Sequence, residues 1–144
     1  MAKGLIASAA TTIEAPKARV WDALVDRAAL KQYMFGADVI SDFREGSAIV
    51  WKGEWKGKPY EDKGTILQAR PGETLDYTHY SPLAGKPDVP DSYHTVKITL
   101  SEEGPRTRVS LVQDGNENEE SKSHAEENWN KMLGGLKKYV EAPR

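Results

Sequence analysis

One long amphipathic stretch closes the sequence, and it limits the architectures that the rest of the chain can adopt. Between residues 124 and 141 apolar residues recur at steps of three and four, which places them on one side of a helix. The segment before it alternates between strand-like runs and turns, so one helix over about residues 120–141 has to cover the resulting sheet. The apolar positions are Ala125, Trp129, Met132, Leu133, Leu136 and Val140.

This predicted helix contains two glycines and a cap signal. Gly134 and Gly135 lie in its interior, where each glycine costs about 1 kcal/mol relative to alanine. We expect the pair to let the helix backbone approach the sheet closely or bend around it. Ser123 and Glu126 have the spacing of a capping box, which predicts that the helix begins near them.

The remaining elements predict an α+β fold. Residues 5–13 form a strand pattern, and Pro16 and Asp26 are suited to begin two short helices. Residues 47–113 then alternate between strand-like runs and glycine or proline turns, which favours hairpin-linked antiparallel strands. A straight helix on a strongly curved antiparallel sheet leaves space at one end, and such spaces bind small molecules.

Composition excludes several classes of function. The 144 residues fit a single domain over 1–144, and the net charge of -2 comes without the basic stripe that nucleic-acid binding needs. There is no cysteine, so thiolate and disulfide chemistry are excluded. No stretch approaches the roughly 20 apolar residues of a membrane span or has the pattern of a signal peptide, so we expect a cytoplasmic protein.

The candidate ligand-contacting residues come from the closing helix and from aromatic positions on the strands. Each has a simpler interpretation as a core residue, because aromatic and aliphatic side chains mostly fill cores. Trp51 and Trp55 share a face if their strand is regular, whereas a bulge at Gly53 between them is the alternative that would break the alternation. The predicted cavity residues are Trp51, Trp55, Tyr77, His79, Tyr93, Trp129, Met132, Leu133 and Leu136, with Met34 and Phe35 at the mouth.

Histidine offers the clearest route to chemistry. If the proline-rich loop joins its strands symmetrically, Tyr80 pairs with Tyr93 and His79 lies opposite His94. Such a pair suits a metal ion or acid–base catalysis, with Glu61 or Asp62 as a third group, but ordinary polar roles are the simpler interpretation. Cofactor motifs such as a phosphate loop or a dinucleotide fingerprint are absent, so we predict neither a cofactor nor a metal.

Four stretches in order resemble one known family. They are "TIEAPKARVWDALVDRAALKQYMF", "EWKGKPYEDKGTILQARPGETLDYTHYS", "TRVSLVQDGN" and "NWNKMLGGLKKYVE". Together they resemble the activator of heat-shock-protein-90 ATPase homologue-like (AHSA-like) group of the START-related (SRPBCC) superfamily. The resemblance implies a helix-grip fold of the birch-pollen-allergen kind, with an antiparallel sheet around a long C-terminal helix and a cavity between them. Superfamily members bind lipids, sterols or polyketides, and some catalyse cyclisation or dehydration.

Three functions follow as hypotheses. We prefer a non-enzymatic monomer or weak dimer that binds a small hydrophobic or amphipathic ligand, such as a lipid, sterol or polyketide. The second is a stress-response accessory that contacts a chaperone through the charged hairpin around Lys56 and Lys58. The third is a cyclase- or hydrolase-like enzyme that uses His79, Tyr77 or Glu61 in the same cavity.

Overall fold

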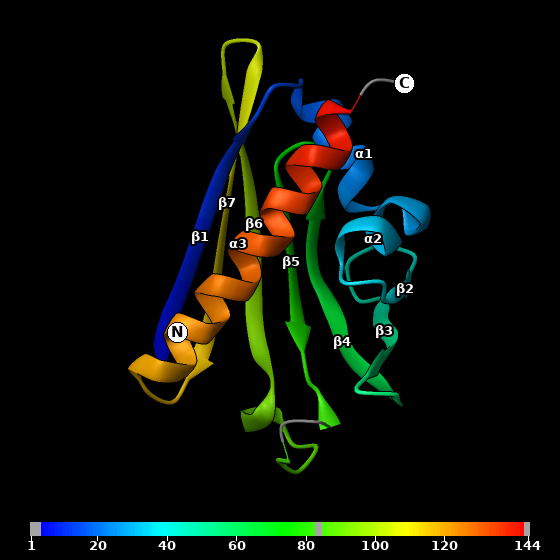
Figure 1. Cartoon of the computed structure of the whole chain (residues 1–144), viewed down its shortest axis with the longest axis vertical. Coiled ribbons are helices and arrows are strands. Elements are labelled where there is room, and N and C mark those ends of the chain that lie inside the picture. Colours follow the sequence, from blue (N-terminus) through cyan, green and yellow to red (C-terminus); the bar gives the residue numbers. More distant parts are fainter. Residues whose placement is uncertain (1–3, 83–84, 143–144) are drawn as a thin grey trace.

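The computed structural model describes residues 4–82 and 85–142, except for the side chain of Trp55 (Figure 1). Strands alternate with short helices at the start, and the chain ends on one long helix. The elements are β1 (Leu5–Ile13), α1 (Lys17–Leu24), α2 (Arg27–Tyr33), β2 (Asp38–Ser41), β3 (Ala48–Trp55), β4 (Lys58–Arg70), β5 (Thr74–His79), the 3-10 turn η2 (Pro90–Ser92), β6 (His94–Glu103), β7 (Arg106–Asn116) and α3 (Glu119–Glu141). Within the described ranges, no helix is long and apolar enough to cross a membrane.

The strands form one curved antiparallel sheet with the order β1-β7-β6-β5-β4-β3-β2. The first strand therefore pairs with the last, with Thr12 opposite Arg108, while α3 runs obliquely across one face of the sheet (Figure 1). This is the helix-grip arrangement that the sequence predicted. At Gly64 the strands β4 and β5 approach closely, since a Cβ atom there would lie 1.7 Å from the carbonyl oxygen of Thr78. Only glycine permits β4 to approach β5 so closely.

The two short helices begin as predicted and lie beside α3. The side chain of Asp26 accepts a hydrogen bond from the backbone N–H of Ala29, which caps α2. The hydroxyl group of Tyr33 donates to the carbonyl oxygen of Ala23 over 2.8 Å and so joins α2 to α1. Arg27 forms two 2.7 Å hydrogen bonds with Asp38, which fix α2 against β2.

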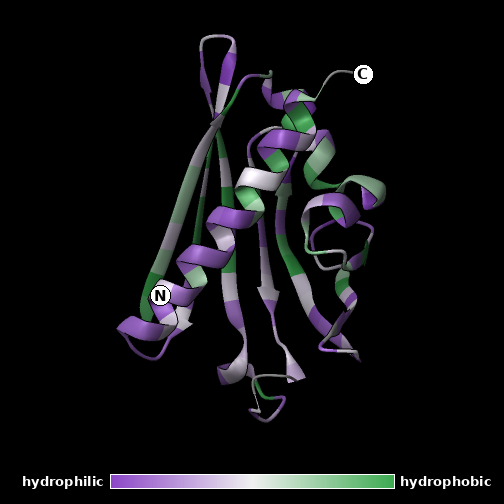
Figure 2. Cartoon of the chain, viewed as in Figure 1, coloured by the Kyte–Doolittle hydropathy of each residue, from purple (hydrophilic) through white to green (hydrophobic). Residues whose placement is uncertain are grey.

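The two halves of α3 differ in burial. Its buried side chains begin at Met132 and continue with Leu133, Leu136 and Val140, all at most 2% exposed. The N-terminal half, before Met132, contains no buried residue and is largely hydrophilic (Figure 2). The C-terminal half therefore packs on the core, and the N-terminal half leaves room between itself and the sheet.

The start of α3 corrects the predicted capping box. The helix begins at Glu119, and the side chain of Asn118 accepts a hydrogen bond from the N–H of Ser121. Ser123 and Glu126 therefore lie inside the helix. Glu126 instead accepts a 3.0 Å hydrogen bond from the N–H of Ser8, which ties α3 to β1. The cap prediction was wrong because Asn118 supplies an acceptor one turn earlier.

The two helix glycines also differ from expectation. A Cβ atom at Gly135 would lie 3.0 Å from the Cβ of Tyr33, so this glycine permits close approach of α2 rather than of the sheet. A Cβ atom at Gly134 would have no neighbour within 4 Å. Gly134 therefore has no packing role that would repay its helix cost.

Of the two alternatives at Gly53, the structure has the regular strand and no bulge. β3 pairs with β4 in continuous register from Ala48 to Trp55, with Gly53 opposite Tyr60. A Cβ atom at position 53 would lie 2.7 Å from the hydroxyl oxygen of Tyr60, so the glycine makes room for this ring. The strand is regular, and Trp51 keeps the orientation that alternation predicts.

Candidate functional site

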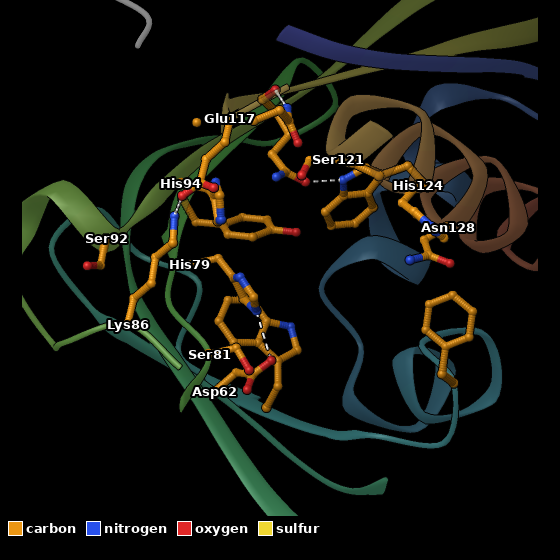
Figure 3. A pocket seen from close by; sticks show the side chains of 18 of the residues that line it. Asp62, His79, Ser81, Lys86, Ser92, His94, Glu117, Ser121, His124 and Asn128 are labelled. Carbon is orange, nitrogen blue, oxygen red and sulfur yellow. Dashed lines mark hydrogen bonds and ion pairs between the residues drawn. The ribbon is translucent and has the colours of Figure 1, made fainter. Parts of the chain in front are cut away.

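A cavity of 1010 Å³ lies between the N-terminal half of α3 and the sheet. Sheet residues face helix residues across it: His79 and His94 come from one side, and His124 and Asn128 from the other (Figure 3). Its lining combines aromatic and polar groups. The lining residues are Met34, Phe35, Ala37, Trp51, Tyr60, Asp62, Tyr77, His79, Ser81, Lys86, Ser92, His94, Gln113, Gly115, Asn116, Glu117, Asn118, Glu120, Ser121, His124, Ala125, Asn128 and Trp129.

An aromatic cluster forms the apolar part of the wall. The ring centroid of Trp51 lies 5.4 Å from that of Tyr77 and 4.9 Å from that of His79, which it meets edge-on. Burial raises the pKa of Tyr77, so its hydroxyl group stays protonated. On the helix side, the indole N–H of Trp129 donates to the side-chain oxygen of Gln113 and joins α3 to β7. The apolar part of the wall is thus held by ring packing and by a hydrogen bond.

His79 is held by a buried carboxyl group. Its Nε2 lies 2.9 Å from Oδ2 of Asp62, a residue that is only 9% exposed. Cross-strand register explains the contact, since Asp62 lies opposite Trp51 and Trp51 touches His79. The other carboxyl oxygen, Oδ1, is buried without a hydrogen-bond partner among the described residues. Leaving a buried acceptor without a hydrogen bond costs about 1–3 kcal/mol, so a hydrogen-bond donor placed beside Oδ1 would be stabilising.

His94 lies directly opposite His79 in the β5–β6 pairing, and Tyr80 stacks on Tyr93, as the sequence predicted. Nδ1 of His94 lies 2.9 Å from the carbonyl oxygen of Asp114. Burial lowers the pKa of His94 below its ordinary value. The neighbouring Gly115 has φ +76°, and a Cβ atom there would lie 2.6 Å from Nδ1 of His94. This glycine therefore makes room for the imidazole ring.

The charged groups of the wall are mostly acidic. Asp62, Glu117 and Glu120 line the cavity, and Lys86 is the one lysine or arginine of its described lining. Lys86 forms an ion pair with Glu117 (Figure 3), which lowers the pKa of that carboxyl group. The cavity therefore offers no unpaired lysine or arginine to an anionic ligand.

The structure brings together four of the nine predicted cavity residues: Trp51, Tyr77, His79 and Trp129. Met132 lines only a separate void of 20 Å³ behind Trp51 and Tyr77. Leu133, Leu136 and Tyr93 are not among the described residues that line the cavity or the smaller void. The two leucines are fully buried in the core, and Tyr93 stacks on Tyr80 and donates to Asp88. The side chain of Trp55 lies outside the described part of the chain.

Several polar lining residues were missed. Ser121 and Asn128 lie four residues before and three residues after Ala125 of the predicted stripe, so they extend this face of the helix with small and polar side chains. A stripe that changes from apolar to small and polar along one helix is the signal that could have located the cavity. At the mouth, Met34 and Phe35 line it as expected. Phe35 is 64% exposed and has a left-handed φ of 56°.

Of the two acidic residues that the sequence offered as partners for the histidines, only one contacts a histidine. Asp62 contacts His79, whereas Glu61 is exposed on the other face of β4 and pairs with Lys52 at 3.9 Å. The described residues contain no group of three His, Cys, Asp or Glu residues that could hold a metal ion.

Comparison with known proteins identifies the family. The family described as Activator of Hsp90 ATPase homolog 1-like protein matches residues 14–141. The solution structure of ChR145 from Cytophaga hutchinsonii is 56% identical in sequence, with a TM-score of 0.85 over 98% of this chain and 97% of that one. No protein among those with curated descriptions matches the sequence significantly.

More distant structures share the fold. The Aha1 dimer from Colwellia psychrerythraea is 18% identical, with a TM-score of 0.74 over 95% of this chain and 96% of that one. DynU16, from the dynemicin biosynthetic locus, is 15% identical, with a TM-score of 0.78 over 95% of this chain and 47% of that one. These two similarities concern the fold alone.

Proposed function

The chain belongs to the Activator of Hsp90 ATPase homolog 1-like family, and from this premise and its cavity we propose that it binds a small amphipathic molecule without chemically changing it. The observation that carries the proposal is the 1010 Å³ cavity, at the upper end of the usual range for ligand sites. The family name concerns chaperone activation, but the proposal rests on the cavity.

The lining suggests how the ligand would be oriented. Its apolar part would lie against Trp51, Tyr77 and Trp129, where aromatic faces offer large contact area. Its polar part would face His79, His94 and the first turns of α3. A purely apolar ligand would leave these polar groups without partners, so the lining favours an amphipathic one.

Filling the cavity tests the proposal. Ala125 is a half-buried wall residue of α3, and A125W would place a large ring into the space. K131W is the matched control, because Lys131 is an exposed residue of the same helix outside the described lining. Native mass spectrometry with an amphipathic library, followed by tryptophan fluorescence titration, should show binding to the wild type and K131W, and at least tenfold weaker binding to A125W. Failure of the wild type to retain any ligand would reject the proposal.

A further inference from the structure

Two imidazole rings come from directly paired residues at the polar part of the cavity wall. His79 and His94 are direct partners in the antiparallel pairing of β5 and β6, so both side chains leave the same face of the sheet. Both line the cavity (Figure 3). Their hydrogen bonds determine what they offer to a ligand.

The partner of His94 fixes its tautomer. A carbonyl oxygen only accepts hydrogen bonds, so Nδ1 of His94 carries the hydrogen that is donated to Asp114 over 2.9 Å. Nε2 of the neutral ring then keeps its lone pair. Burial lowers the pKa of His94, which favours this neutral form at neutral pH. His94 therefore offers an acceptor at Nε2.

The contact of His79 with Asp62 orients the ring. Nε2 lies 2.9 Å from Oδ2 of Asp62, and a carboxylate accepts, so Nε2 donates. Nδ1 then carries a lone pair in the neutral ring, whereas both nitrogens donate in the imidazolium form. Oδ1 of Asp62 remains a buried acceptor without a partner among the described groups. Its unsatisfied acceptor character adds to the negative potential beside the ring.

We propose that this part of the cavity recognises a hydrogen-bond donor on the ligand, a hydroxyl or ammonium group, through Nε2 of His94 and, in its neutral form, Nδ1 of His79. The inference rests on the proposed function, since it specifies which amphipathic ligands the cavity takes. The rest of the wall agrees, because Asp62, Glu117 and Glu120 disfavour a carboxylate or phosphate, and Lys86 is paired with Glu117.

Probes that share one ring system test this chemistry. 2-Naphthol carries a hydroxyl donor, 2-methoxynaphthalene has the same ring without the donor, and 2-naphthoate carries an anion. Isothermal titration should give an affinity for 2-naphthol about fivefold higher than for the methyl ether, the effect expected of one hydrogen bond. 2-Naphthylmethylammonium should also exceed the ether, and 2-naphthoate should bind most weakly. The relative affinities of the hydroxyl and ammonium probes distinguish the two donor classes.

Two variants locate the effect. H94F and H79F should lose the preference for 2-naphthol over the ether while still binding the ether. T99F is the control, because Thr99 is exposed on the opposite face of β6 from His94. Circular dichroism and thermal unfolding establish that each variant is folded, and the wild-type probe series is informative even if a variant does not fold.

The outcomes separate the two proposals. Equal affinity of the wild type for 2-naphthol and the ether would overturn the donor site while leaving the binding function intact. Tightest binding of 2-naphthoate, or an unchanged preference in folded H94F and H79F, would overturn it as well. Absence of binding by any of the four probes, together with failure of the library screen, would instead reject the proposed function.

Discussion

His94 illustrates how a single residue links burial, geometry and stability. Its ring is held between the carbonyl oxygen of Asp114 and the space that Gly115 provides. Charged and titratable groups around it come from several segments: His79 on β5, Asp114 on β7, Lys86 in the loop after β5, and Glu117 before α3. Desolvation is the largest influence and lowers its pKa below 6.5. Protonation of His94 is therefore coupled to unfolding.

The sign of this coupling gives a prediction. Between pH 6.5 and the lower pKa of the folded chain, the unfolded chain binds more protons, so the free energy of unfolding falls as the pH falls through this window. Above pH 6.5 the contribution of His94 is complete and constant. Urea unfolding of the wild type and H94Q at pH 8, 7, 6 and 5 should show the stability of the wild type decreasing relative to H94Q below pH 6.5. A stability difference that is independent of pH would contradict the account.

For single residues, the sequence allowed us to predict which residues pair across strands. It did not allow us to predict which side chains face the cavity and which are buried in the core. The pairing of His79 with His94 was predicted on the assumption that the proline-rich loop joins its strands symmetrically, and the structure has this pairing. Whether Leu133 or Trp129 faces a cavity depends on how far α3 stands from the sheet, and that distance is set by tertiary packing. The spacing of apolar residues identifies the apolar face of a helix, but it does not show whether that face meets side chains or a cavity.

The helix α3 combines two tasks within one element. Its C-terminal half is anchored by Met132, Leu133, Leu136 and Val140, and its N-terminal half bounds the cavity. Hydrogen bonds hold the N-terminal half in place, from Ser8 to Glu126 and from Trp129 to Gln113. Polar contacts can hold a helix off a sheet where apolar packing would close the space.

The corrected helix start predicts different effects for two neighbouring substitutions. N118A removes the acceptor for the N–H of Ser121 and should lower the free energy of unfolding by about 1 kcal/mol. S123A changes an exposed interior position of the helix and should be neutral or slightly stabilising. Chemical denaturation measures both variants. A larger loss for S123A than for N118A would restore the capping box that the sequence indicated.

The glycine pair provides a second comparison within α3. G134A adds a methyl group in open space and should raise the free energy of unfolding by about 0.5–1 kcal/mol through helix propensity. G135A places its Cβ 3.0 Å from the Cβ of Tyr33, whose buried ring is fixed by its bond to Ala23, so overpacking should make it destabilising. Thermal unfolding ranks the two variants. Equal stabilisation by both would show that α2 yields easily at this contact.

For the whole molecule, the order of helices and strands along the chain was the most informative feature for predicting the fold. A strand, two short helices, a series of hairpins and one amphipathic helix predicted an α+β arrangement with one helix across a sheet, and the family resemblance implied the helix-grip fold that the structure has. The polar character of the cavity was not predicted, because its lining residues come from strands, loops and a helix that are far apart in the sequence, among them β4, β6 and the loop before α3. Their convergence is a property of the curved sheet and helix together.

The most direct test of the central claim is a ¹H–¹⁵N NMR titration of the wild-type chain with 2-naphthol. A ligand in the cavity should cause saturable shifts at the wall, including the indole N–H groups of Trp51 and Trp129 and the backbone of His79 and Ala125. Val140, at the far end of α3 in the core, should not shift. Shifts scattered over the outer face of the sheet, with the indole signals of Trp51 and Trp129 unchanged, would contradict this claim.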